Sequence, residues 1–188
     1  MTTYYDKTFE SKTFTNDDLS LTQFESCTFK NCQFRDLHIK DLVFEECEFH
    51  TCDFSGTHLN QCAMRFVVFY DCKLIGLNFE HLNPFRLSLK FYSCLMDYTN
   101  FFNLKLMASI FEKCSLKGAD FKQANLTKAN FSGSKLDEAV FQQTNLSQAD
   151  FRHCQGYLIN PIINQIRGAK FSKDEVLGLL FQFGIKIE

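Results

Sequence analysis

Residues 119–151 read ADFKQANLTKANFSGSKLDEAVFQQTNLSQADF, and every fifth residue of this stretch, counted from Phe121, is Phe or Leu. The same spacing extends over most of the chain. An apolar residue stands at every fifth position from Phe9 to Phe79 and, after a step of twelve residues, from Phe91 to Phe151. A fixed internal period is typical of solenoid proteins, so this spacing sets the fold class.

A period of five fits neither of the regular secondary structures. On an α-helix a step of five turns the side chain by about 140°, and on a strand an odd step moves it to the opposite face. A short extended piece followed by a bend, repeated every five residues, returns each apolar side chain to the inside. The residue two places earlier shares that face, and from Thr22 onward it is small or apolar in every repeat. Each repeat therefore has two inward and three outward residues.

Segments such as Ala119-Asp120-Phe121, Ala124-Asn125-Leu126 and Ala149-Asp150-Phe151 resemble the pentapeptide-repeat family, over about residues 7–155. The resemblance implies an all-β fold, a right-handed quadrilateral β-helix with one repeat per side and about seven coils. Coils about 4.8 Å apart would make a rod on the order of 35 Å long. We expect the β-helix over residues 1–155. The predicted inward core includes Phe29, Phe49, Phe69, Phe101, Phe121 and Phe141.

All nine cysteines stand at the small inward position of the repeat, where other repeats have Ala, Ser or Thr. We interpret them as buried apolar fillers rather than as zinc ligands or disulfide partners. Free thiols are typical of a reducing compartment. No apolar segment approaches the about 20 residues of a membrane span, and no signal peptide is apparent. We therefore expect a cytoplasmic protein that contacts neither membrane nor nucleic acid.

Two irregularities interrupt the repeat. Lys7 and Lys12 occupy the inward small-residue position near the start, which indicates a terminal coil open to water, as solenoids need. The step of twelve residues contains Asn83-Pro84-Phe85-Arg86, and proline cannot donate to a β-ladder. We expect a bulge that divides the rod near residues 83–86. Both a harmless insertion and a recognition feature remain open as interpretations of this break.

The segment 156–188 is predicted to cap the rod or to join two copies. Ser172 and Glu175 form a potential capping box and Gly184 a potential C-cap, so we expect a short α-helix over about 173–183. Its apolar residues are too many for one stripe. Either they cover only the chain's own core, or they form a homodimer, as the topoisomerase-protecting members of the family do with a similar tail. The predicted dimer interface consists of Leu177, Leu180, Phe181, Phe183, Ile185 and Ile187.

No catalytic constellation is visible in the sequence. The histidines all fall at outward positions, and there is no phosphate-binding loop or nucleophile elbow. We expect a protein that is not an enzyme and that has no cofactor and no metal site.

Charge is unevenly distributed, with a net charge of −6 over residues 1–82 (13 acidic, 7 basic) and +3 over residues 83–155 (6 acidic, 9 basic). The densest acidic group is Glu45, Glu46, Glu48 and Asp53, predicted to lie on two neighbouring sides of the coil. It is either a surface that imitates the phosphate backbone or an ordinary solvated surface.

The resemblance to the quinolone-resistance and microcin-immunity branch implies a DNA mimic that binds a type II topoisomerase, DNA gyrase or topoisomerase IV. Such a protein would protect the enzyme from a poison such as a quinolone or a peptide toxin. The sequence lacks an obvious long projecting loop of the kind that plasmid-borne members carry. The alternative is a protein-interaction scaffold with an unknown partner, which the absence of a strongly acidic stripe favours.

Overall fold

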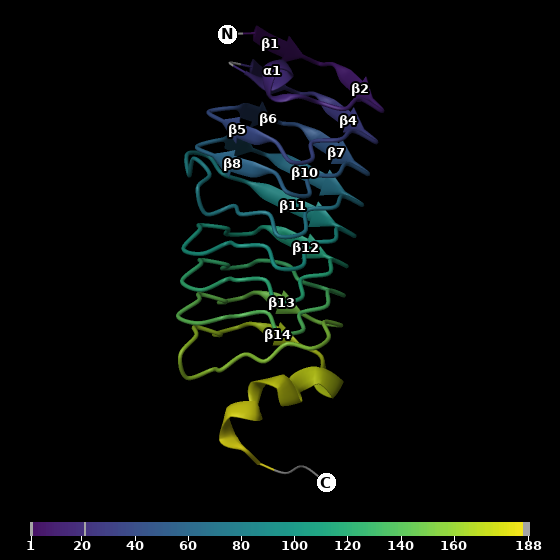
Figure 1. The fold of residues 1–188 in the computed structure, drawn as a ribbon. Coiled ribbons are helices and arrows are strands. Elements are labelled where there is room, and N and C mark those ends of the chain that lie inside the picture. Colours follow the sequence, from purple (N-terminus) through teal and green to yellow (C-terminus); the bar gives the residue numbers. More distant parts are fainter. Residues whose placement is uncertain (1, 21, 186–188) are drawn as a thin grey trace.

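The computed structural model describes residues 2–20 and 22–185, which form an elongated rod of stacked coils (Figure 1). All paired strands are parallel, and most partners are 20 residues apart, as in the pairs Thr2↔Thr22 and Phe29↔Phe49. Four five-residue repeats therefore complete one coil. The predicted β-helix is confirmed, with about eight turns instead of about seven.

The four sides of the coil are numbered here in chain order. The first side carries β1 (Thr2–Tyr5), β3 (Thr22–Glu25), β6 (Val43–Glu45) and β9 (Ala63–Arg65). The second carries β2 (Thr8–Glu10), β4 (Thr28–Lys30), β7 (Glu48–His50), β10 (Val67–Tyr70), β11 (Leu89–Tyr92) and β12 (Ile110–Glu112), and near the C-terminus β13 (Asp150–Phe151) and β14 (Lys170–Phe171). The third is joined by single bridges such as Thr13↔Gln33, and the fourth carries β5 (His38–Lys40) and β8 (His58–Asn60).

The corners between sides explain why the repeat is five residues long. At most corners the backbone takes a left-handed conformation, with φ of 51° at Asp6 and 53° at Ser26. An Asn or Asp just before the central apolar residue supports the bend. The Asn125 Oδ1 accepts the Thr127 N–H at 3.1 Å, and the Asn130 Oδ1 accepts the Ser132 N–H at 2.9 Å. These local hydrogen bonds favour a turn over a continued strand, and they account for the Ala-Asn-Leu and Ala-Asp-Phe segments of the sequence.

The central apolar residues stack in columns along the rod axis. The longest column lies behind the second side, and its neighbouring rings are 4.6–5.3 Å apart and nearly parallel. Rings of adjacent columns meet edge to face, as Phe121 and Phe131 do at 5.5 Å and 89°. The second-side column consists of Phe9, Phe29, Phe49, Phe69, Phe91, Phe111, Phe131, Phe151 and Phe171.

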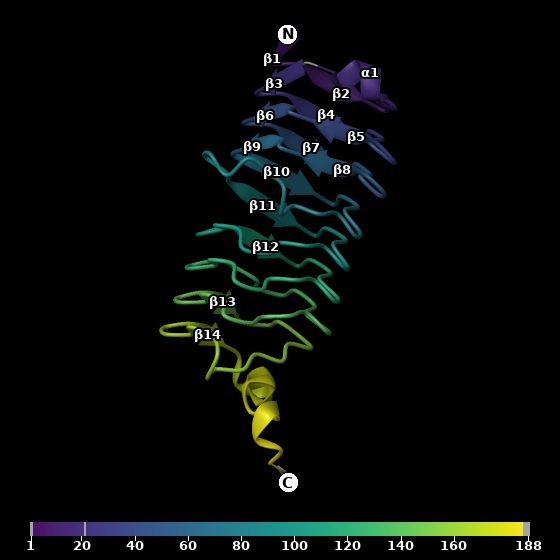
Figure 2. The same ribbon diagram turned by 60° about the vertical axis from the view of Figure 1, so that its left-hand side comes forward.

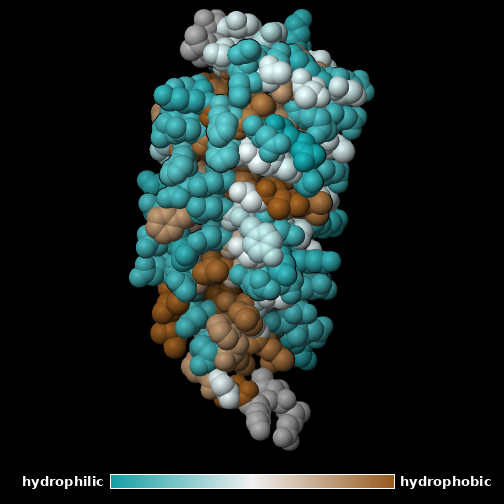
Figure 3. Space-filling model, in the orientation of Figure 1, coloured by the Kyte–Doolittle hydropathy of each residue, from teal (hydrophilic) through white to brown (hydrophobic). Residues whose placement is uncertain are grey.

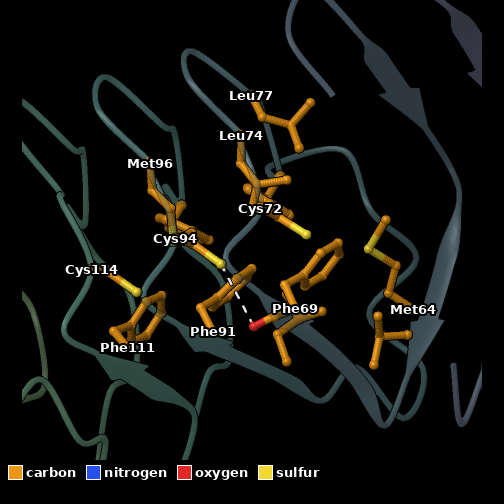
Figure 4. Packing of buried hydrophobic residues seen from close by; sticks show 14 of the residues in the cluster. Met64, Phe69, Cys72, Leu74, Leu77, Phe91, Cys94, Met96, Phe111 and Cys114 are labelled. Carbon is orange, nitrogen blue, oxygen red and sulfur yellow. Dashed lines mark hydrogen bonds between the residues drawn. The ribbon is translucent and has the colours of Figure 1, made fainter. Parts of the chain in front are cut away.

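The small inward residues form a second set of columns beside the rings. All nine cysteines are buried and free, and Figure 4 shows Cys72, Cys94 and Cys114 on successive coils. The Cys94 Sγ lies 3.6 Å from the Phe69 carbonyl oxygen, so the thiol donates to the backbone of the neighbouring coil. Burial raises the pKa of Cys47 and of Cys154 to about 12, so both thiols stay neutral.

The break in the repeat is a two-residue insertion on the first side. The strands β10 and β11 pair with an offset of 22 residues (Val67↔Leu89), whereas β11 and β12 return to 20 (Lys90↔Ile110). Figure 2 shows the additional chain as a loop that projects beside β9. Leu87 forms an antiparallel bridge with Arg65. The second-side column therefore continues through the break, because the additional residues bulge outward.

The β-helix extends past its predicted end at residue 155. Asn145 bridges to Gln165, and Phe151 pairs with Phe171, so a further coil follows Gly156. The sequence concealed this coil because Gly156 and Pro161 stand in place of Phe or Leu at two of its central positions. Tyr157 and Ile159 are buried there instead.

The predicted α-helix over 173–183 is wrong in type, because the structure has two 3₁₀ helices, η1 (Lys173–Leu179) and η2 (Phe181–Phe183). The Gly178 carbonyl accepts the Ile159 N–H at 3.1 Å, which draws it away from an α-helical bond. Ser172 does not cap the helix, since its Oγ accepts the His153 N–H at 2.8 Å. Gly184 is the left-handed C-cap that the sequence predicted, with φ of 59°.

The N-terminal coil contains a helical turn that the sequence analysis did not predict, α1 (Asn16–Leu19). A Thr15–Asp18 capping box begins it, and Leu19 reaches the core. Hydrogen bonds from Lys12 and Thr15 lower the pKa of the Asp18 carboxyl to about 2. The lysine at the inward position of this coil is therefore paired at the open end of the rod.

Replacing Phe121 with Ala should destabilise the rod by about 3–5 kcal/mol, because the change leaves a cavity in a column. The Phe121 ring is buried between Phe101 and Phe141, each 5.1 Å away. The matched control is Phe102→Ala at the neighbouring, partly exposed outward position, which should cost less than about 1 kcal/mol. Urea unfolding measures both, and equal losses would contradict the inward assignment.

Candidate interaction surfaces

The outward side chains of the fourth side form a groove. His38 and His58 stack at 4.6 Å on the fourth side, where they line a groove of about 820 Å³ together with His81. Two corner glycines, Gly56 and Gly76, also line this groove. Among the described residues, no group of three or more His, Cys, Asp or Glu side chains is placed to bind a metal ion. No helix within residues 2–20 and 22–185 is long and apolar enough to cross a bilayer.

The predicted acidic group is spread over three sides rather than two. Glu45 lies in β6 on the first side, Glu46 at the next corner, Glu48 in β7 on the second side, and Asp53 on the third side. The step of five residues per side separates them, because Asp53 is one full repeat beyond Glu48.

Two of these four carboxylates are held by cations. The Glu45 carboxylate accepts hydrogen bonds from Arg65 and Arg86, both at 2.9 Å. The Asp53 carboxylate lies 3.8 Å from the Lys73 ammonium and 3.9 Å from the Arg35 guanidinium. Glu46 and Glu48 are exposed and supply the remaining acidic surface of this group.

A cluster of aromatic and charged side chains surrounds the insertion, and we call it the mid-rod cluster: Glu45, Arg65, Phe66, Phe85 and Arg86. The Arg65 guanidinium lies 5.4 Å from the centre of the Phe85 ring, and the Arg86 guanidinium lies 5.2 Å from that of Phe66. Glu45 joins the two arginines. The side chains therefore interlock across the break. The sequence indicated the break, and the structure adds that Phe85 and Arg86 contact side chains 20 positions earlier.

The C-terminal segment presents an apolar surface at the end of the rod. Leu179 packs against the core, and Leu180 is half-buried. The other predicted interface residues within the described part of the chain are exposed, and Ile187 lies outside the described residues. Figure 3 shows apolar side chains gathered at this end. The exposed set comprises Leu158, Ile162, Ile163, Val176, Leu177, Phe181, Phe183 and Ile185.

A family model for pentapeptide repeats matches residues 47–81 and 114–152, in eight copies. Together with the stacked coils described above, these matches show that these two parts of the chain consist of pentapeptide repeats. No curated protein matches the chain in sequence.

Solved structures with the same fold include QnrB1, described as a plasmid-mediated fluoroquinolone resistance protein. A trypsin-treated form is 16% identical with a TM-score of 0.82, and the match covers 100% of this chain and 99% of QnrB1. A second trypsin-treated form is 15% identical with a TM-score of 0.66, covering 99% and 100%. HetL from the cyanobacterium Nostoc, involved in heterocyst differentiation regulation, is 16% identical with a TM-score of 0.51, covering 90% and 84%.

Replacing Glu45 with Ala should destabilise the protein by about 1–2 kcal/mol, because two arginines lose a charge-assisted hydrogen bond in a partly exposed site. The neighbouring Glu46→Ala is the control. Glu46 is exposed and has no ion pair among the described residues, so a change within about 0.5 kcal/mol is expected. Chemical denaturation of the two variants provides the comparison. A loss at Glu46 as large as that at Glu45 would show that the arginine contacts contribute nothing.

Proposed function

We propose that this chain is a non-enzymatic, cytoplasmic protein that binds a type II topoisomerase, DNA gyrase or topoisomerase IV, as a DNA mimic. It would protect that enzyme from a poison such as a quinolone or a peptide toxin. The observation that carries the proposal is the end-to-end structural match to the fluoroquinolone resistance protein QnrB1, with a TM-score of 0.82. The match includes the C-terminal segment as well as the repeats, since it covers the whole chain.

The charge of the N-terminal half supports DNA mimicry. Residues 1–82 have a net charge of −6, and Asp6, Glu25 and Glu46 are outward carboxylates on three successive coils of the first side. A surface with this excess of negative charge can enter a basic groove shaped for phosphates. Because Glu45 and Asp53 are neutralised by neighbouring cations, Glu46 and Glu48 are the members of the acidic group proposed to contact the enzyme.

A supercoiling assay with purified DNA gyrase and a fluoroquinolone tests this function. Micromolar protein should restore supercoiling in the presence of the drug. The double variant Glu46→Lys, Glu48→Lys should lose at least about tenfold in potency, since two favourable contacts become repulsive. The control Glu138→Lys reverses a charge in the C-terminal half and should leave potency unchanged. No protection by the unaltered protein, with either gyrase or topoisomerase IV, would reject the proposal.

We also propose that two copies join through the C-terminal segment. Its exposed apolar side chains lie together at the end of the rod, and burying them against a second copy removes them from water.

Replacing both Leu180 and Phe181 with Glu should convert a dimer into a monomer, because each charge would be buried without a partner. Sedimentation in about 0.5 M salt is the appropriate measurement, since salt screens any contact between surface charges. Thermal unfolding of the variant serves as the folding control. An unchanged sedimentation mass would contradict the proposed interface.

The second candidate function is a protein-interaction scaffold for another partner. The neutralisation of two of the four acidic residues favours it, because less of the surface then resembles DNA. The likeness to HetL is consistent with this candidate, since HetL is a pentapeptide-repeat protein involved in regulating differentiation. Reproducible recovery of one other protein from cell extract, together with inactivity in the supercoiling assay, would favour the scaffold.

A further inference from the structure

Exposed apolar side chains lie on the first side of the rod, near the middle of its length. Among the described residues, the large exposed apolar side chains lie in β1, around the insertion, or at the C-terminal end. Around the insertion, Phe66 and Phe85 are 49% and 63% exposed, and Met107 follows on the same side. Two further exposed side chains of this region, Leu95 and Tyr98, lie on the third side and at its corner.

The backbone at Phe66 is unfavourable for a residue of its kind. Phe66 lies at a corner with φ of 55°, a position where most coils hold a small or polar residue. A bulky side chain is a rare occupant of the left-handed region. The ring is half exposed, so burial within the chain does not offset that strain. Such strain is often found at functional positions, which makes the mid-rod cluster a candidate contact surface.

Charge is segregated along the first side, in contrast to the other sides. Among the described residues of this side, Asp6, Glu25 and Glu46 precede the mid-rod cluster with no cation among them. After the cluster the sign of the charge is reversed. The charged residues there are Lys105, Lys128 and Arg167, with no carboxylate among them.

The other sides mix the two signs within short distances. Arg152 pairs with Asp150 at 2.7 Å on the second side, and Lys122 pairs with Asp120 at 2.9 Å on the fourth. Within the described part of the chain, Lys105, Lys128 and Arg167 have no such ion pair. The first side is thus acidic in one half and basic in the other, with the aromatic cluster between them.

We propose that the first side binds the first side of a second copy of this chain, antiparallel, about a twofold axis through the mid-rod cluster. Glu46 lies one coil before Phe66, and Lys105 lies one coil after Phe85; Glu25 and Lys128 lie two coils away in the same directions. Rotation about the axis therefore brings each acidic coil opposite a basic coil of the partner.

The chemistry of the surface suits a second copy better than an unrelated molecule. A uniformly acidic partner would be repelled by Asp6, Glu25 and Glu46. A uniformly basic partner would be repelled by the three cations. A twofold contact satisfies both halves at once, because each surface is its own complement. Phe66 and Phe85 then lie at the centre of the contact, where aromatic and arginine side chains contribute most.

The contact is separate from the proposed C-terminal interface and does not depend on the proposed function, although it shares Glu46 with the proposed enzyme-binding surface. The insertion lies at mid-length, whereas η1 and η2 cap the end of the rod (Figures 1 and 2). The experiment is therefore done on the full chain with Leu180→Glu and Phe181→Glu, which removes the tail contact, and in about 50 mM salt.

Equilibrium sedimentation should detect a dimer in this background. The single reversals Glu25→Lys and Lys128→Glu should each weaken dimerisation at least tenfold. The double variant should return to within about threefold of the parent, and a mixture of the two single variants should form the mixed dimer. The control Glu138→Lys, on the third side, should change nothing. A monomeric parent, or a double variant as weak as the singles, would overturn the proposal.

Phe66→Asn separates association from folding. Asparagine accepts the left-handed conformation more readily than phenylalanine, so the midpoint of urea unfolding should be unchanged or higher. Dimerisation should weaken at least tenfold. Phe85→Ser, at the second exposed aromatic residue, should weaken dimerisation in the same way. The control Leu95→Ser, on the third side, should leave dimerisation unchanged. Unaltered dimerisation in both phenylalanine variants would show that the mid-rod cluster is not the contact.

Discussion

Stacking of rings from successive coils is the interaction on which the rest of this structure depends. The second-side column passes from Phe9 to Phe171, and neighbouring rings are nearly parallel throughout. Each fully buried side chain of this size contributes about 1.5–3 kcal/mol, and an aromatic pair adds about 0.5–1.5 kcal/mol. The rod is thin, so its stability comes from contacts between neighbouring coils. Hydrogen bonds between coils and the turn conformation at the corners hold each ring above the next.

The repeat made the architecture and the inward residues predictable from the sequence, because one spacing determines both. It did not predict the end of the rod. There Gly156 and Pro161 replace the central Phe or Leu of two repeats, although the β-ladder continues to Phe171. The 3₁₀ helices depend on a contact between Gly178 and Ile159 across the end of the core, which no local pattern encodes. Features that arise from contacts between distant segments are therefore the ones that the sequence concealed.

The candidate surfaces were less predictable than the core, for a related reason. Outward positions are mostly polar but otherwise variable, and the contacts of each side chain depend on neighbours one coil away, 20 residues distant in sequence. Glu45 belongs to an acidic group in the sequence but is held by Arg65 and Arg86 in the structure. Phe66 stands at a corner where the repeat expects a small or polar residue, and this departure was a sequence signal for the mid-rod cluster. The inner columns fix the shape of the rod and leave the outer residues to determine what it binds.

Removal of whole coils tests the stacking of columns most directly. Deleting residues 105–144, which are two coils, leaves Leu104 followed by Asn145 in the same phase of the repeat. This variant should unfold cooperatively, and its long dimension in solution scattering should shorten by about 10 Å. Deleting residues 105–146 removes two residues more, so the chain is two residues too short to complete a coil. An excess of two residues can bulge outward, as the insertion at Pro84–Leu87 does, but a deficit cannot be absorbed in this way. Only the first variant should fold as a shortened rod, and equal behaviour of the two variants would contradict the stacking of side chains in fixed columns.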